Sequence, residues 1–358
     1  MSKKQCEINS RLGKVGGQAV LEGVMMKSGN TVAVSVRRED GKIASDVSTF
    51  ESARKKHKIL NIPLVRGVVN FIEMLSLSMK TLTRSAELSG IDEGVEESKF
   101  EKWLKEKFGK SVLNIVMGVG LFLGILLAIA LFFLAPNFLA AQLNKLIPFD
   151  PIWQGLFAGI IKIMLFILYL YLVSLMKDIR RTFEYHGAEH KSIFCYEKGE
   201  ELTVENVKKQ RRFHPRCGTS FMFVMLFIGM LLSVGVRILV TYGIGFTIEN
   251  TALHALFYAG INIVILLPLI VGTGYEFLMF AGKHDNVIVR ILSAPGLWMQ
   301  RLTTREPDDK QIEVAIRSLK LAMPDVFPPE EETTESAEPS PDMDAPEKNE
   351  TSEENAAD

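Results

Sequence analysis

The segment FEYHGAEHKSIFCYE spans residues 183–197 and contains two histidines four positions apart. On a helix, His186, Glu189 and His190 share one face, because they occupy positions i, i+3 and i+4. Their order, H-x-x-E-H, is that of the inverted zincins, in which two histidines bind zinc and the glutamate acts as general base. Three fixed letters in five make a weak motif, so the segment is also compatible with a solvated helix that is rich in histidine.

A second cluster strengthens the metal hypothesis. The segment RFHPRCGTSF contains His214 and Cys217, and imidazole and thiolate are the usual ligands of zinc. Glu276, further along the chain, is another candidate ligand. We therefore expect a divalent transition metal, preferably zinc, held by both histidines of the first segment and by one of these three residues, with Glu189 as the catalytic base. The sequence does not distinguish a fully ligated structural site from an open catalytic one.

Four long apolar segments surround these clusters. Each exceeds the roughly 20 residues that a helix needs to cross the hydrocarbon core of a bilayer. Helices in a soluble core rarely stay apolar on all sides over such lengths. We therefore predict four transmembrane helices, over residues 112–134, 155–176, 219–242 and 252–275.

The orientation follows from positive charges in the short loops, which favour the cytoplasm. Loop 177–218 contains ten Lys or Arg residues, whereas loop 135–154 contains only Lys145 and loop 243–251 contains none. The loop with the histidine clusters should therefore face the cytoplasm, together with both termini. The three cysteines are sparse and odd in number, which fits that reducing compartment.

Two charged side chains, Lys162 and Arg237, lie within the predicted spans. Arg237 is five residues from the end of its span, so we expect it to snorkel to the outer surface. Lys162 lies deeper, where it should pair with another group or line a cavity.

The first 111 residues predict a small cytosolic α+β region. Alternating valines over residues 32–36 and the turn signal Asp40-Gly41 indicate a β-hairpin, with a third strand before it. Residues 62–89 have the spacing of an amphipathic helix, which could pack under the bundle or lie on the membrane surface. We expect packing, through an apolar stripe formed by Val65, Val68, Val69, Ile72, Leu75 and Met79.

Beyond the fourth span, residues 276–324 predict short cytosolic helices with a break at Glu306-Pro307 and a cap at Asp308 or Asp309. Residues 325–358 contain thirteen Asp or Glu and one Lys among repeated Pro, Ser and Thr. That composition cannot bury enough apolar surface to offset the entropy of ordering, so we expect a disordered acidic tail. The predicted fold class is a mainly α integral membrane protein, with regions at 1–111, 112–275, 276–324 and 325–358.

Six segments together resemble the YqhQ family of bacterial membrane proteins: GGQAVLEGVMM (16–26), PLVRG (63–67), EYHGAEHK (184–191), HPRCGTSF (214–221), YEF (275–277) and APGLWMQRLTTREPDD (294–309). The resemblance extends over about residues 11–323. The function of the family is unknown, and its frequent description as a predicted metal-dependent enzyme rests on the same His, Glu and Cys positions. The resemblance therefore implies a bacterial cell membrane and adds little about mechanism.

Two classes of function remain open. The first is a metal-dependent enzyme, hydrolytic in type, at the cytoplasmic face of the membrane. The second is a non-catalytic scaffold or transporter whose His/Cys site is structural or regulatory. Three protein ligands with an open position would favour the first class, and four would favour the second. The expected partner is the lipid bilayer and not nucleic acid; a homo-oligomer stays an open alternative, and the sequence points to no particular protein partner.

Overall fold

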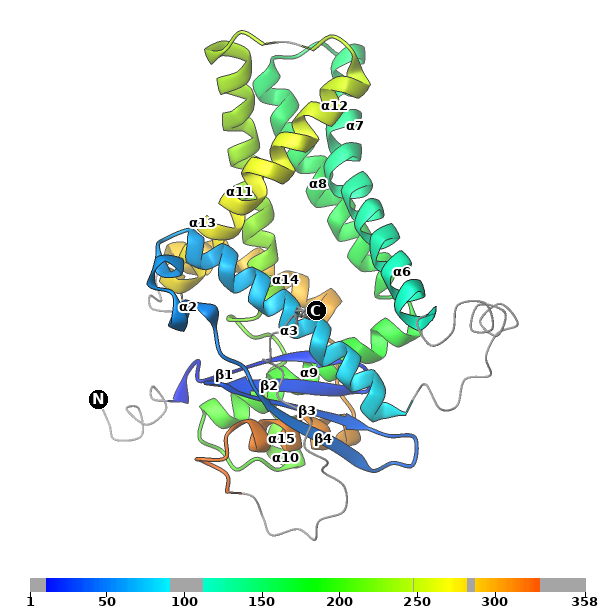
Figure 1. Ribbon diagram of the computed structural model, residues 1–358, viewed down its shortest axis with the longest axis vertical. Helices are drawn as coiled ribbons and strands as arrows, with labels where there is room; N and C mark the ends of the chain where they lie inside the picture. Colours follow the sequence, from blue (N-terminus) through cyan, green and yellow to red (C-terminus); the bar gives the residue numbers. More distant parts are fainter. Residues whose placement is uncertain (1–10, 91–111, 247, 282–286, 329–358) are drawn as a thin grey trace, which may run out of the picture.

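A computed structural model describes residues 11–90, 112–246, 248–281 and 287–328. Long helices extend from one end of the molecule, and a β-sheet flanked by helices occupies the other end (Figure 1). Among the described residues, four helices are long and apolar enough to cross a membrane, as predicted. Their outward side chains are apolar and exposed, for example Phe122, Leu127 and Leu231.

Three of these four helices contain a π-helical turn, and two are longer than predicted. The four candidate spans are Gly118–Leu146, Ile152–Val173, Met222–Gly243 and Thr251–Ala281. The first continues past Pro136, although a proline usually ends a helix, because a π-helical turn just before it accommodates the missing N–H. The elements are α6 (Val112–Ile129), η3 (Ala130–Leu134), α7 (Ala135–Leu146), α8 (Pro151–Val173), α11 (Gly218–Ile238), η4 (Leu239–Gly243), α12 (Thr251–Ile261), η5 (Asn262–Leu266) and α13 (Leu267–Ala281).

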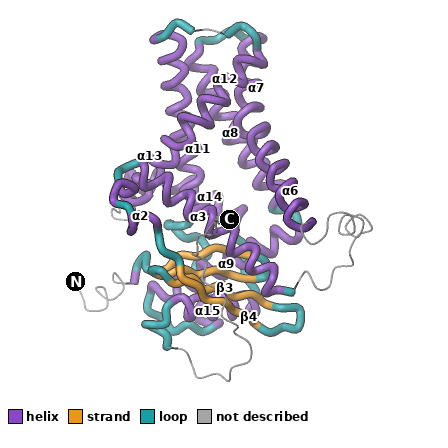
Figure 2. Tube along the Cα trace, viewed as in Figure 1, coloured by secondary structure: helices purple, strands orange, loops and turns teal. Residues whose placement is uncertain are grey.

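The N-terminal region forms an antiparallel meander of four strands (Figure 2). The strands are β1 (Val15–Val20), β2 (Gly23–Ser28), β3 (Thr31–Arg37) and β4 (Ile43–Thr49). The predicted hairpin is β3–β4, with Gly41 at positive φ in its turn. We predicted one strand before this hairpin, but the chain forms two there, β1 and β2, because it reverses at Leu21-Glu22.

Helices cover both faces of the sheet. Alternation along β2 and β3 directs Val24, Met26 and Ala33 to one face and Met25 and Val34 to the other. The second face is covered by α3 (Val65–Ser89), through Leu77. The first face is covered by α9 (Lys177–Glu197) and α15 (Asp309–Ala322), and the Ser318 hydroxyl donates to the Ala33 carbonyl at 3.0 Å. The sheet end of the molecule is therefore built from three distant segments that share one core, rather than from the N-terminal region alone.

The amphipathic helix α3 packs through a face that the sequence did not indicate. Its buried residues are Gly67, Leu77, Thr81, Ser85 and Ser89, whereas Ile72, Leu75 and Met79 are exposed. The expectation that the large apolar stripe packs inside the protein is therefore wrong for these residues. Small and polar side chains let α3 lie close to the sheet and α13, which leaves the stripe outward. Two short helices precede α3, at α2 (Ala53–Lys56) and η1 (Lys58–Asn61).

Helix α9 carries the H-x-x-E-H motif and is separate from the spanning helix before it. The chain turns at residues 174–176, after α8 ends, so α9 runs beside the sheet instead of continuing the axis of α8 (Figure 1). A methyl group on Gly187 would lie 2.0 Å from the carbonyl oxygen of Arg305, and the Arg305 N–H donates to the Phe183 carbonyl at 2.9 Å. Glycine at position 187 thus lets residues 303–307 lie directly against α9.

The remaining helices follow the predicted pattern. Helix α10 (Val204–Lys208) is capped by Thr203. Helix α14 (Val287–Thr303) is separated from α15 by the predicted break at Glu306-Pro307, and Asp308 caps α15 in a capping box with Gln311.

The start of the predicted acidic tail is part of the folded core. Phe327 packs against the core, with its ring 6.2 Å from that of Tyr196. The predicted tail therefore begins too early, because the Phe327 ring reaches buried surface, although Val326 is exposed. The rest of the predicted tail, residues 329–358, lies outside the described part.

Replacement of Gly187 by alanine should destabilise the protein strongly. The new methyl group would clash with the Arg305 backbone carbonyl, which cannot move aside as a flexible side chain can. We expect the free energy of unfolding to fall by at least about 2 kcal/mol. The matched control is Gly260→Ala on α12, where the added methyl group would meet nothing within 4 Å. Thermal unfolding of both variants in one detergent is the measurement, and equal melting temperatures would contradict the close approach.

Deletion of residues 329–358 should leave the melting temperature unchanged, whereas Phe327→Ala in the full chain should lower it. The half-buried ring contributes about 1–2 kcal/mol through the apolar surface that it covers. A deletion that destabilises more than Phe327→Ala would show that the acidic segment itself contacts the folded part.

Candidate metal centre

Three of the predicted ligands meet at the start of α11. Ligand atoms of His186, His190 and Cys217 all lie within 4.8 Å of one another, and His186 Nε2 is 3.3 Å from Cys217 Sγ. Both histidines come from one face of α9, with ring centroids 4.4 Å apart, as the i, i+4 spacing predicts. Cys217 is the N-cap residue of α11, so the turn into that helix brings the thiol to the histidines.

Backbone carbonyls orient both imidazole rings. His186 Nδ1 lies 2.8 Å from the Thr303 carbonyl oxygen, and His190 Nδ1 contacts the Arg212 carbonyl oxygen. A carbonyl oxygen can only accept, so each Nδ1 carries the hydrogen and each Nε2 presents a lone pair. This is the arrangement by which proteins fix the tautomer of histidine ligands.

Glu189 lies beside the three ligand residues in a buried position. Its Oε2 atom is 4.0 Å from His186 Nε2. Burial raises the pKa of Glu189 to about 7, and the nearby His186 opposes that shift only in part. Strand β1 covers this carboxyl group, since a methyl group on Gly17 would lie 2.9 Å from the Glu189 side chain. Gly17 thus lets the backbone of β1 lie close to α9.

The donor set fits a transition-metal ion. Among the described residues, His190 Nε2 and Glu189 Oε2 are buried without a hydrogen-bond partner, which is costly for polar atoms. Both atoms belong to the cluster. Tetrahedral zinc separates nitrogen and sulfur ligands by roughly 3.3–3.6 Å, given bond lengths of about 2.0–2.3 Å. The 3.3 Å between His186 and Cys217 lies in that range, and the larger separations, up to 4.8 Å, require small side-chain movements.

His214 lies next to these ligands but has other partners. Its ring centroid is 5.5 Å from that of His190, and its Nδ1 accepts the Arg216 N–H at 3.3 Å. Its Nε2 is directed at Glu197 Oε2, 3.6 Å away, and this buried nitrogen has no hydrogen-bond partner among the described residues. Burial lowers the pKa of His214, and Glu197 offsets part of that effect. The structure therefore places His214 beside the cluster, as packing for His190.

Glu276 is not brought to the cluster. Its two carboxylate oxygens bind the guanidinium group of Arg66, with one contact at 2.7 Å, and one of them also accepts the Leu64 N–H at 3.3 Å. The sequence suggested Glu276 because it follows the fourth span, but proximity to the end of a span does not specify which side of the bundle a side chain faces.

Several residues that support the site were missed from the sequence. Glu197 accepts hydrogen bonds from Gly13 N–H and from Arg216. It lies seven positions after His190, on the same face of α9, and this helical spacing could have identified it. Gln300 holds the His214 backbone at both ends, accepting its N–H and donating to its carbonyl, each at 2.7 Å. No local sequence pattern connects residues 86 positions apart, so only the structure reveals these two hydrogen bonds of Gln300.

Comparison with known proteins supports one family. A family model described as protein of unknown function (DUF1385) matches residues 62–325. The chain is 36% identical over 308 residues to the uncharacterized protein YqhQ of Bacillus subtilis (strain 168), which covers 85% of this chain and 90% of that protein. No solved structure gives a significant match. On the length and identity of these matches, the chain belongs to the YqhQ family.

Proposed function

We propose that the protein is a four-span bacterial membrane protein with its sheet region, both termini and the His/Cys cluster in the cytoplasm. The exposed apolar faces of the four long helices support insertion. The ten Lys and Arg residues between α8 and α11 support the orientation, whereas the opposite loops contain almost none. The exposed stripe of α3, with Ile72, Leu75 and Met79, would then face the inner leaflet.

We further propose that the cluster is the active site of a metal-dependent hydrolase. The observation that carries this proposal is the convergence of two oriented Nε2 lone pairs and a thiol with a buried carboxyl oxygen that has no partner. His186, His190 and Cys217 would hold the metal, preferably zinc, and leave a fourth position open. Catalytic zinc sites have three protein ligands and an open position, and His186, His190 and Cys217 supply three candidate ligands.

The residues around the cluster have separate roles in such a reaction. A bound zinc ion supplies Lewis acidity, which makes water a nucleophile near neutral pH. Glu189 would accept the proton of the attacking water and return it to the leaving group, and a pKa of about 7 suits both directions of transfer. Strand β1 covers Glu189 and excludes bulk water, whereas the half-buried His186 and Cys217 leave the substrate an approach.

A structural metal site is the second candidate, in a non-catalytic membrane scaffold or transporter. The burial of His190 and the adjacent imidazole of His214 favour it, because a rotated His214 ring would give a fourth protein ligand. The number of protein ligands on the bound metal separates the two candidates.

The purified protein should contain one equivalent of zinc, which His186→Ala/His190→Ala should abolish and Glu189→Gln should retain. His57→Ala is the matched control, since this exposed histidine lies outside the cluster. X-ray absorption at the zinc edge should give two nitrogens, one sulfur and one oxygen. A third nitrogen in place of the oxygen would support the structural site, and equal, substoichiometric zinc in all variants would refute metal binding.

A cysteine placed at Leu146 should react with a membrane-impermeant maleimide in intact cells, whereas one at Lys198 should not. Leu146 is 80% exposed at the end of α7, and Lys198 is exposed at the end of α9. The parent chain without an added cysteine measures any labelling of the native thiols. Labelling at Lys198 in intact cells would reverse the orientation and remove the centre from the cytoplasm.

A further inference from the structure

Arg237 is the largest fully buried side chain among the described residues, although it lies in a long apolar helix. The expectation that it snorkels to the surface is therefore wrong. Gly155 on α8 makes room for it, since a methyl group there would lie 2.8 Å from Arg237 Cδ. A buried guanidinium group is costly unless it is paired with an anion.

The partners of Arg237 within the protein are neutral. One terminal nitrogen donates to Asn137 Oδ1 at 2.8 Å, and the other lies 3.5 Å from His254 Nε2. The guanidinium carbon is 4.0 Å from the centroid of the Tyr258 ring. Arg237 Nε and His254 Nδ1 are buried without a hydrogen-bond partner in the described part of the chain.

No carboxylate of the described residues forms an ion pair with Arg237. Two acidic residues lie at this end of the bundle. Asp150 caps α8 and accepts the Tyr242 hydroxyl, so it is already engaged. Glu249 lines the same cavity as Arg237 without an ion pair to it. Within the described part of the chain, the positive charge of Arg237 thus has no counter-ion.

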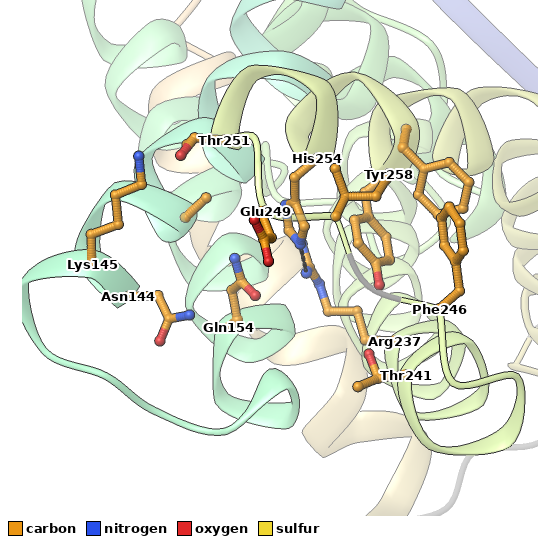
Figure 3. Close-up of a pocket in the computed structure, with 13 residues that line it drawn as sticks. Asn144, Lys145, Gln154, Arg237, Thr241, Phe246, Glu249, Thr251, His254 and Tyr258 are labelled. Carbon is orange, nitrogen blue, oxygen red and sulfur yellow. Dashed lines mark hydrogen bonds between the residues drawn. The ribbon is translucent and has the colours of Figure 1, made fainter.

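A cavity of about 200 Å³, lined by both polar and apolar side chains, lies beside this charge. Figure 3 shows Arg237 reaching toward His254, with Gln154 and Glu249 nearby and Lys145 further out. The cavity volume is several times the roughly 30 Å³ of one water molecule. The π-helical turn η4 begins two residues after Arg237 and contributes Thr241 to the lining, and such turns frequently mark functional sites.

We propose that this cavity binds a phosphate group, with Arg237 as its principal charge. The site lies at the end of the bundle opposite the His/Cys cluster and does not depend on metal binding there (Figure 1). Arginine is the side chain best suited to oxyanions, because its planar guanidinium group donates several hydrogen bonds. Arg237 and Lys145 together exceed the single negative charge of Glu249, so the lining carries a net charge that a phosphate group would compensate.

The phosphate group could belong to a lipid headgroup or to a free phosphate. Phe246 and Phe257 line the cavity and contact one another, with ring centroids 5.3 Å apart, which suits the boundary between headgroups and acyl chains. A free phosphate would enter from the water beside the exposed Lys145. A lipid headgroup and a free phosphate present the same chemical group to Arg237. Binding experiments with each of the two ligands therefore distinguish the two sources.

The test measures binding to the full chain in detergent. Radiolabelled inorganic phosphate is followed by equilibrium dialysis, and phosphatidylglycerol is followed by native mass spectrometry with diacylglycerol as the lipid that lacks phosphate. At least one of the two phosphates should bind, and Arg237→Gln should weaken that binding about tenfold or more. Lys162→Gln is the matched control, because Lys162 is a span cation that lies over Phe133 and does not line the cavity.

The outcomes assign the site or remove it. Binding of phosphatidylglycerol alone identifies a lipid headgroup, and binding of inorganic phosphate alone identifies a soluble ligand. If Arg237→Gln fails to fold, Lys145→Gln tests the same cavity from its exposed rim and should weaken binding severalfold. The proposal is overturned if the wild type binds neither phosphate, if diacylglycerol binds as well as phosphatidylglycerol, or if the folded cavity variants bind as tightly as Lys162→Gln.

Discussion

The close packing of α9 between two backbones is the constraint on which the centre depends. On one side β1 approaches the Glu189 side chain at Gly17, and on the other residues 303–307 approach the helix at Gly187. Neither approach leaves space for a Cβ atom, so the two glycines determine how near the neighbouring segments can come. The nearness of one segment brings the Thr303 carbonyl to His186, and the nearness of β1 keeps water away from Glu189.

Two main-chain carbonyls and one side chain, that of Gln300, hold the cluster in place. The carbonyls of Thr303 and Arg212 fix the two imidazoles, and Gln300 holds the loop that leads to Cys217. Main-chain groups hold their positions better than flexible side chains do, so little further ordering is needed when a ligand arrives. Helix α9 also belongs to the hydrophobic core of the sheet, through Tyr185 and Ala188, and this links the stability of the core to the geometry of the cluster.

The sequence predicted the parts of the structure that depend on local pattern. Hydropathy identified the four long helices, turn residues identified β3–β4, and helical spacing placed His186, Glu189 and His190 on one face. The sequence did not predict β1, because two adjacent glycines disfavour a β-strand. The glycine at position 17 is explained by the close approach of the Glu189 side chain, which only the structure shows. The sequence also did not distinguish Cys217, which joins the histidines, from Glu276, which binds Arg66, since the packing of distant helices decides that difference.

The shared core of the sheet region has a consequence for biosynthesis. Ser318 and Ala33 are hydrogen-bonded although they are 285 positions apart, and all four long helices lie between them. A ribosome delivers the strands first, so the face with Val24, Met26 and Ala33 is only partly covered, by α9, until α15 emerges. The nascent sheet must be protected from aggregation throughout that interval, and contacts so distant in sequence form slowly. The Thr303 carbonyl also arrives late, so a nascent chain holds His186 long before it can orient that ring, whereas the Arg212 carbonyl that orients His190 follows soon after it.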